Sequence, residues 1–397
     1  LIPLSGAVTS REAYSFFGNS AVFFILGAFI LAACLMKSGL STRLSLLFLR
    51  RFGRTPRTLL ISTFLLNAFM AFWMSEHAVA AMNFPIVLEI VAVLGLRPYS
   101  SSYGKAMFIA LAWGSTIGGV ATLLGGGRAP LAIAMLHEAL GSSSYTFLSW
   151  SLYALPTVVV MLGVGYLVLS RWFPIDIESV EQAEKALEER VGRLGRMTFE
   201  EKAIGLIMLG TVVVWMGFGH ELGLANVAIA SVVLLFILRL VAWRDVEEYV
   251  NWGIVLMYGG AICLGAALDR SGAAMWLAKG TLGAWADGPA SAIASMSLVT
   301  WLLTEAMSNS AVVAMMMPVG LGLAPEVGIE QLSLIAPAIA IPAGLAFAFP
   351  IGTPANAIAY SSGFLRLRDL IVPGALMGLI AWVIFNLTVN LYWPLLG

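Results

Sequence analysis

The sequence contains little charge for its length. Only 11% of the 397 residues are charged, whereas 60% are hydrophobic, and the mean hydropathy is +0.91. A soluble domain usually carries about 25% charged residues, so this composition excludes a soluble protein of two or three globular domains. Most of the surface must therefore face lipid, which predicts an integral membrane protein.

Cysteine is rare, and charge of either sign is not in excess. Both cysteines, Cys34 and Cys263, lie inside apolar stretches, which indicates small packing residues and not a disulfide or a metal pair. The 22 basic residues balance the 22 acidic residues. No basic face is therefore available for a nucleic acid, and that class of partner is excluded. Membrane lipid is the expected partner.

Apolar stretches suited to transmembrane helices recur along the chain. We expect helices at about 21–36, 106–124, 147–170, 203–219, 224–242, 253–268, 334–350 and 370–393. Two further apolar segments, 58–85 and 292–318, are interrupted by Ser75-Glu76-His77 and Ser308-Asn309-Ser310. Each predicts a re-entrant helical hairpin, because a polar tip is tolerated at membrane depth only where protein encloses it. The pattern is that of a multi-pass protein of a bacterial-type inner membrane.

The distribution of Lys and Arg sets the orientation that we expect. With both hairpins re-entrant, eighteen of the 22 basic residues fall on one side, which the positive-inside rule assigns to the cytoplasm. The other side holds Arg11, Arg270 and Lys279, and Arg128 is alone in an apolar context. The C-terminus is then non-cytoplasmic. The charged segment 176–202 predicts an amphipathic cytoplasmic linker, with a plain solvated connector as the alternative.

The sequence repeats itself at an offset of 233 residues. At this offset, seven of the twelve residues of 74–85 are identical to those of 307–318, and Gly27 falls on Gly260. We therefore expect a first repeat at 1–175 and a second at 203–397. Each has a hairpin followed by a broken helix, at 106–137 and at 334–361. Because the charge count places the hairpins on opposite sides, the topology is expected to be inverted.

Four elements that interrupt the apolar pattern fall into two repeat-related pairs. Two are the hairpin tips, and two are the segments 118–130 and 352–356, which are rich in glycine and proline. Glycine and proline at this depth indicate broken helices, whose freed carbonyls bind cations while their N-termini favour anions. Hydroxyl and amide side chains beside them are oxygen ligands for a hard cation such as sodium.

These motifs resemble the divalent anion/sodium symporter family, which carries dicarboxylates, citrate and sulfate. That family has Ser-Asn-Thr at each hairpin tip and a Gly-Thr-x-Pro-Asn-like break, to which Ser308-Asn309-Ser310 and the segment 349–358 are similar. The resemblance implies a homodimer, an elevator motion, and one sodium ion near Thr304, Asn309, Gly352 and Asn356. It also implies a substrate site for a small anion, and the candidate residues are Ser75, His77, Arg128, Ser308, Asn309, Ser310, Thr353 and Pro354.

The first half departs from this pattern in a correlated way. Glu76 and His77 replace the Asn and Thr of the tip, and Arg128 stands in the break. A lone charge inside a membrane costs several kcal/mol, so we expect Arg128 to pair with Glu76 and to occupy the place of the first sodium. Alternatively, Arg128 clamps the substrate anion. His77 is either a proton carrier or a hydrogen-bonded core residue.

The expected function is secondary active transport of a small divalent anion, with reduced or absent sodium coupling. Succinate, malate, citrate and sulfate all remain open as substrates. A cation/proton antiporter and a non-transporting anion sensor are the alternatives. An enzyme is not expected, because adjacent residues of a helix such as Ser75, Glu76 and His77 point about 100° apart and form no catalytic triad.

Overall fold

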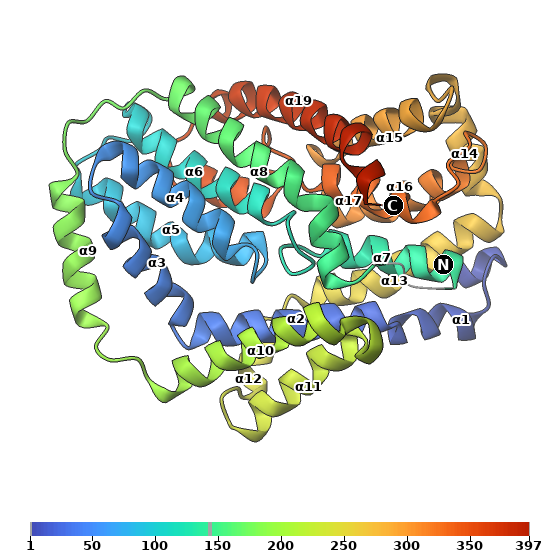
Figure 1. Cartoon of the computed structure of the whole chain (residues 1–397), viewed down its shortest axis with the longest axis horizontal. Helices are drawn as coiled ribbons and strands as arrows, with labels where there is room; N and C mark the ends of the chain where they lie inside the picture. The colour runs from blue at the N-terminus through green and yellow to red at the C-terminus, as the bar shows by residue number, and fades with distance from the viewer. Residues whose placement is uncertain (1, 142–144, 397) are drawn as a thin grey trace.

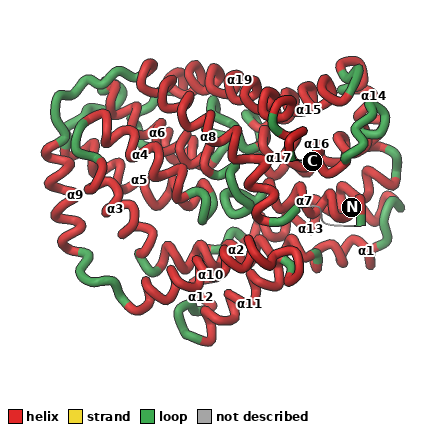
Figure 2. Tube along the Cα trace, in the orientation of Figure 1, coloured by secondary structure: helices red, strands yellow, loops and turns green. Residues whose placement is uncertain are grey.

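The fold is all-helical, as the sequence predicts. The computed structural model describes residues 2–141 and 145–396, and its regular structure in these ranges is entirely helical (Figures 1 and 2). The α-helices are α1 Ser10–Ser15, α2 Ser20–Lys37, α3 Leu40–Phe52, α4 Pro56–Met70, α5 Glu76–Val93, α6 Ser102–Gly118, α7 Arg128–Leu140, α8 Phe147–Trp172, α9 Glu181–Arg193, α10 Phe199–Leu222, α11 Leu224–Ile237, α12 Trp243–Tyr249, α13 Trp252–Arg270, α14 Ala273–Thr281, α15 Pro289–Thr304, α16 Asn309–Leu323, α17 Ile335–Ala343, α18 Pro354–Ser361 and α19 Leu367–Leu391.

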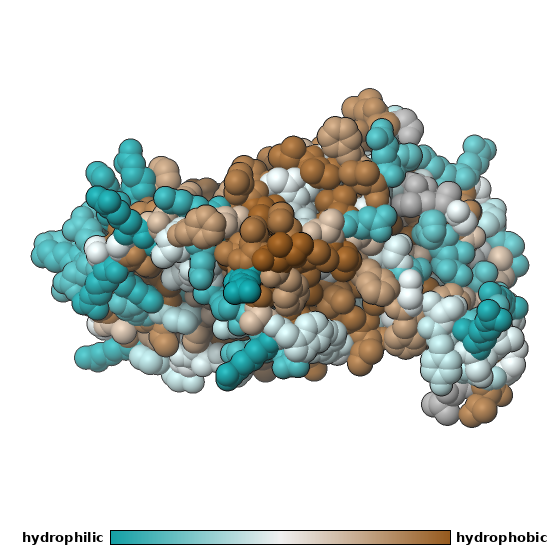
Figure 3. Space-filling model, turned by 90° about the horizontal axis from the view of Figure 1, so that it is seen from below, coloured by the Kyte–Doolittle hydropathy of each residue, from teal (hydrophilic) through white to brown (hydrophobic). Residues whose placement is uncertain are grey.

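An apolar band crosses the middle of the face shown in Figure 3. Six helical segments of the described residues are long and apolar enough to cross a membrane, and they lie at Ser10–Lys37, Glu76–Val93, Phe147–Trp172, Phe199–Leu222, Trp252–Arg270 and Leu367–Leu395. Hydrophobic side chains gather across the centre of the surface, and hydrophilic ones gather at both ends (Figure 3). Large apolar side chains such as Leu206 and Ile237 are about 70% exposed, which is stable only against lipid.

Helix starts follow the offset of 233 residues that the sequence displays. The offset carries the start of α3 onto α14, of α4 onto α15, of α5 onto α16 and of α6 onto α17. The offset no longer relates the helices that follow. Helix α17 is shorter than its repeat equivalent α6, and α18 starts sooner after α17 than α7 starts after α6. The two halves therefore share one helical plan up to their broken helices.

The two halves face in opposite directions. Helices α2 and α13 contact each other and run antiparallel (Figure 1). The hairpin α4–α5 enters from the end of the molecule where α3 and α9 lie, and the hairpin α15–α16 enters from the end where α14 lies (Figure 1). Although α5 is long enough to cross a membrane, it begins at a hairpin tip in the middle of the molecule. Inverted repeats with re-entrant hairpins are thus the observed architecture.

Each broken helix packs its second piece against the other half. After the break at 119–127, α7 contacts α16 and α17, and after the break at 344–353, α18 contacts α5 and α6. This exchange brings both hairpin tips and both breaks together near the centre of the molecule. Glu76, Arg128, Asn309 and Asn356 of these elements are thereby buried in protein, as their depth requires.

Several helix predictions differ from the structure. The helix expected at 106–124 ends at Gly118, and the one expected at 224–242 ends at Ile237. Helices α3 and α14 lie in segments that we expected to be loops, because α3 is short and amphipathic and its basic residues indicated a cytoplasmic connection. The helix expected at 334–350 ends at Ala343, since the N–H groups of residues 347–349 bond to the Glu305 side chain and not to the preceding turn.

The segment between the halves contains a helix with one buried stripe. Helix α9 buries Ala183 and Leu187, four residues apart, and presents charged residues on its other faces. Beyond it, buried Arg43 of α3 donates to Glu201 of α10 (2.7 Å) and to the Leu194 and Gly195 carbonyls (3.0 Å each). The end of the segment is thus tied to α3 of the first half, at the start of α10.

Candidate functional site

Both hairpin tips present a polar residue at the start of a helix. Ser75 and Ser308 are the N-caps of α5 and α16, and both have extended backbone conformations. Glu76 and Asn309 follow as the first helical residues, where free backbone N–H groups and the helix dipole favour a carboxylate or an amide oxygen. The Glu76 N–H donates to the Gly125 carbonyl oxygen (2.9 Å), which ties the first tip to the first break.

The structure brings Arg128 and Glu76 together. Arg128 Nη1 donates to Glu76 Oε2 at 3.1 Å, and the side chains of both residues are at most 5% exposed. A buried carboxylate or guanidinium without such a partner costs several kcal/mol, so each residue accounts for the presence of the other. Arg128 Nη2 is buried and has no hydrogen-bond partner among the described residues, so half of the guanidinium fork remains available.

A cradle of glycines holds the guanidinium. A Cβ on Gly344 would lie 2.1 Å from Arg128 Nε, and a Cβ on Gly126 would lie 2.4 Å from Nη1. Gly344 is also the C-cap of α17, where the negative end of the helix dipole favours a cation. The guanidinium therefore fits here only because residues 126 and 344 are glycines without a side chain.

Asn309 joins the ion pair to the second half. Its Nδ2 donates to Glu76 Oε1 at 3.2 Å, so the two tips contact each other through residues that are 233 positions apart. These are the repeat mates that the sequence alignment identifies. The carboxyl group of Glu76 is thus shared between the guanidinium of Arg128 and the amide of Asn309.

The oxygen of the same amide faces a cluster of oxygens. Thr304 Oγ1 lies 2.8 Å from Asn309 Oδ1 and 2.7 Å from the carbonyl oxygen of Ala343, which is the last residue of α17. Three oxygens from the helices α15, α16 and α17 therefore converge where α17 ends. A hydroxyl, an amide oxygen and a C-terminal carbonyl are a donor set for a hard monovalent cation.

Of the other two residues of the predicted sodium site, Gly352 lies beside this cluster, and Asn356 lies beside the unwound segment that follows α17. A Cβ on Gly352 would lie 3.0 Å from the Thr304 carbonyl oxygen, so only glycine leaves this carbonyl open. Asn356 is fully buried, its Nδ2 donates to the Ala346 and Phe349 carbonyls, and its Oδ1 has no partner among the described residues. Such an orphaned acceptor fits a bound cation, so the residues present fit sodium.

The predicted substrate residues differ in their exposure to solvent. His77 and Ser310 are partly exposed, and Ser308 and Pro354 are exposed, so these four can reach a ligand. Ser75 is buried and lies 3.5 Å from His77 Nε2. Thr353 is also buried, and its hydroxyl accepts from the Asn356 N–H (3.2 Å) as the N-cap of α18. Its role in this structure is to start that helix.

Glu305 is a site residue that the sequence interpretation missed. Its carboxylate accepts hydrogen bonds from the backbone N–H groups of Phe347, Ala348 and Phe349, at 2.9 to 3.3 Å. It thereby holds the unwound segment whose carbonyls surround Asn356. The signal was available, because an acidic residue within an apolar segment is by default functional.

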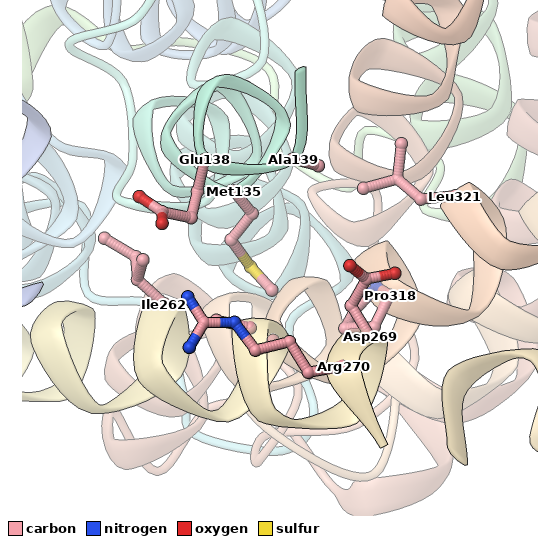
Figure 4. Close-up of a pocket in the computed structure, with 10 residues that line it drawn as sticks. Met135, Glu138, Ala139, Ile262, Asp269, Arg270, Pro318 and Leu321 are labelled. Carbon is pink, nitrogen blue, oxygen red and sulfur yellow. The ribbon is translucent and has the colours of Figure 1, made fainter. Parts of the chain in front are cut away.

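Two hollows flank this network. The larger, of about 470 Å³, lies between α7 and the first turns of α2 and α11, contains His137 and His220, and reaches Leu123 and Pro130 beside the first break. The smaller, of about 80 Å³, lies between α7, α13 and α16. Glu138 of α7 and Arg270 of α13 point into it (Figure 4). None of these four residues is among the predicted transport-site residues, and His137 with Glu138 had been considered only for the enzyme that the sequence does not favour.

Comparison with known sequences places the chain among membrane transporters. The family model described as "Sodium:sulfate symporter transmembrane region" matches residues 2–397. A similar protein is the sodium-dependent dicarboxylate transporter SdcS of Staphylococcus aureus strain USA300, which is 27% identical over 423 residues. That alignment covers 100% of this chain and 80% of SdcS, and the SdcS of strain COL matches to the same extent. These relatives are transporters and not enzymes.

Solved structures show the same fold. The Neisseria gonorrhoeae MtrF structure, titled as that of an antimetabolite efflux pump, superimposes with a TM-score of 0.61 at 14% identity, and covers 95% of this chain and 83% of MtrF. The Alcanivorax borkumensis YdaH transporter superimposes with a TM-score of 0.60 at 15% identity, and covers 97% of this chain and 89% of YdaH. At these identities the likeness concerns the fold alone.

Proposed function

Because the chain belongs to the sodium:sulfate symporter transmembrane family, we propose that it is a secondary active transporter of a small divalent anion such as succinate or malate. The dicarboxylate relatives support this substrate class. The exposed hydroxyl of Ser308, and the partly exposed hydroxyl of Ser310 and ring of His77, would bind the carboxylates at the hairpin tips. Arg128 Nη2, which is buried and has no hydrogen-bond partner within residues 2–141 and 145–396, would supply a charge-assisted bond to the anion.

The observation that carries the rest of the proposal is the buried contact between Arg128 and Glu76. We infer that this pair replaces an exchangeable cation in the first half, while Thr304, Asn309, Gly352 and Asn356 bind one sodium ion in the second half. A bound sodium ion would add a mobile positive charge that enters and leaves with the substrate. The resident guanidinium cannot leave, so each transport cycle would move fewer cations than two symmetric sites allow.

The motion and assembly that we propose are those of an elevator-type homodimer. The hairpins and broken helices pack on one another across the two halves, which supports their movement as one body against α2, α10, α11 and α13. Most of the Lys and Arg residues lie at the end that contains α3 and α9, which supports a cytoplasmic location for this end. The C-terminus would then be non-cytoplasmic.

Counterflow in proteoliposomes tests this function. Purified protein is reconstituted into proteoliposomes that are loaded with unlabelled succinate. The uptake of labelled succinate, malate, citrate and sulfate is then compared with and without sodium and a pH gradient. We expect accumulation of a dicarboxylate, competed by the other dicarboxylates. Binding without flux would indicate a sensor, and cation flux without anion flux would indicate an antiporter. Either result contradicts the proposal.

A further inference from the structure

The amide of Asn309 has two chemically different ends, and its orientation decides whether a cation can bind. The oxygen end accepts and the NH2 end donates only. In the structure, Nδ2 faces Glu76 Oε1 at 3.2 Å and Oδ1 faces Thr304 Oγ1 at 2.8 Å. If the amide turned over, its NH2 group would point at the Thr304 hydroxyl. A donor in that position excludes a cation.

Glu76 is the group that sets this orientation. A carboxylate offers acceptors only, so it takes the NH2 end of a neighbouring amide. On its other oxygen Glu76 accepts from Arg128 Nη1 at 3.1 Å, which holds the carboxyl group in place. All three side chains are at least nine-tenths buried, so water does not substitute for either partner. The ion pair of the first half therefore reaches the cation ligands of the second half through one amide.

We propose that Glu76 is a positioning residue for the second-half cation site, and that it acts by holding Asn309 Oδ1 toward the Thr304 hydroxyl. This inference rests on the proposed function, since it concerns the sodium ion assigned there. It gives Glu76 a second role that the ion pair with Arg128 does not require. The two halves are then coupled, and the resident charge of one half maintains the sodium affinity of the other.

The substitution Glu76→Gln tests the orientation of the Asn309 amide, because it keeps the shape of the side chain at position 76 and replaces one of its acceptors by a donor. The guanidinium of Arg128 would take the oxygen of the new side chain, which leaves the new NH2 group facing Asn309. Asn309 would then turn its oxygen toward position 76 and its NH2 group toward Thr304. Adding Asn309→Asp corrects this geometry, because a carboxylate presents an oxygen to both sides. It also restores the buried negative charge.

A matched variant isolates the charge. Glu76→Gln with Ser308→Asp returns the negative charge to the same hairpin tip, and aspartate retains the N-cap that Ser308 Oγ provides to the Ala311 N–H. It adds no oxygen beside Thr304. If orientation is decisive, Asn309→Asp rescues sodium binding and Ser308→Asp does not.

Sodium binding can be measured without transport, from the melting midpoint of purified protein in detergent. Sodium chloride replaces choline chloride at constant ionic strength, and bound sodium raises the midpoint. We expect Glu76→Gln to raise the half-maximal sodium concentration about tenfold, and the double variant with Asn309→Asp to return it toward the original value. Unchanged sodium affinity in Glu76→Gln overturns the inference. So does equal rescue by Ser308→Asp.

The outcomes distinguish this inference from the proposed function. If the unsubstituted protein shows no sodium-specific stabilisation, the sodium site of the proposed function is wrong and the inference is wrong with it. If the unsubstituted protein responds and the variants do not differ, only the inference is wrong. Should Glu76→Gln fail to fold, the comparison of the two double variants decides, since both carry the same substitution at Glu76 and the same net charge.

Discussion

Glu76 and Asn309 occupy the same position in the two repeats and hydrogen-bond to each other. Asn309 Nδ2 donates to Glu76 Oε1 at 3.2 Å across 233 residues of sequence. Each is the first residue of the helix that follows a hairpin tip, α5 for Glu76 and α16 for Asn309. Because an acid stands where a symmetric protein would have a second amide, the contact has a fixed direction: a carboxylate only accepts, so Asn309 must donate.

Removing Arg128 alone should be more harmful than removing the whole ion pair. Arg128→Met leaves Glu76 buried without a cation, which costs about 3–5 kcal/mol when one partner of a buried pair is lost. Glu76→Gln combined with Arg128→Met removes both charges and should recover most of the stability. The melting midpoint in detergent measures this. A double variant less stable than Arg128→Met would contradict the pairing.

Substituting Gly344 should disrupt the site through the guanidinium. A Cβ at this position would lie 2.1 Å from Arg128 Nε and 2.5 Å from Cζ, so Gly344→Ala must displace the guanidinium from Glu76. We expect loss of most counterflow activity. Gly163→Ala in α8 is the matched control, because a Cβ there meets no atom within 4 Å. Normal activity of Gly344→Ala would show that Arg128 does not need its observed position.

The carboxylate of Glu305 should be needed to hold the second break. Glu305→Gln replaces one acceptor by an NH2 group that faces backbone N–H groups, and a buried donor left without a partner costs about 1–3 kcal/mol. Stability should fall by that amount, and sodium-specific stabilisation should weaken because the carbonyls around Asn356 lose their support. Glu326→Gln, which breaks an exposed contact with Lys279, is the control and should change stability little.

Much of this architecture could be predicted from the sequence, because a lipid-facing chain cannot hide its polar interruptions. Ser75-Glu76-His77 and Ser308-Asn309-Ser310 mark the hairpin tips, and the energetic cost of isolated buried charge led to the pairing of Glu76 with Arg128. The contact between Glu76 and Asn309 could not be predicted. This contact depends on how the two halves pack against each other, and the sequence pattern of one half does not predict that packing.

Other features were missed for different physical reasons. The close approach of Gly344 to Arg128 is a three-dimensional contact between a break in one half and a break in the other. The early end of α17 depends on Glu305, which captures N–H groups more than 40 residues away. Helix α3 was missed because its basic residues satisfy the charge rule for a loop equally well. Glu305 itself could have been identified, since the rule applied to Glu76 covers it.

The sodium dependence of initial uptake rates in proteoliposomes tests the central claim most directly. A Hill coefficient cannot exceed the number of coupled sites. If Arg128 permanently occupies the cation position of the first half, uptake of a labelled dicarboxylate should depend on sodium with a Hill coefficient near one, or should proceed by exchange without sodium. A steep dependence with a Hill coefficient of two or above would show that both halves bind sodium, and would contradict the claim.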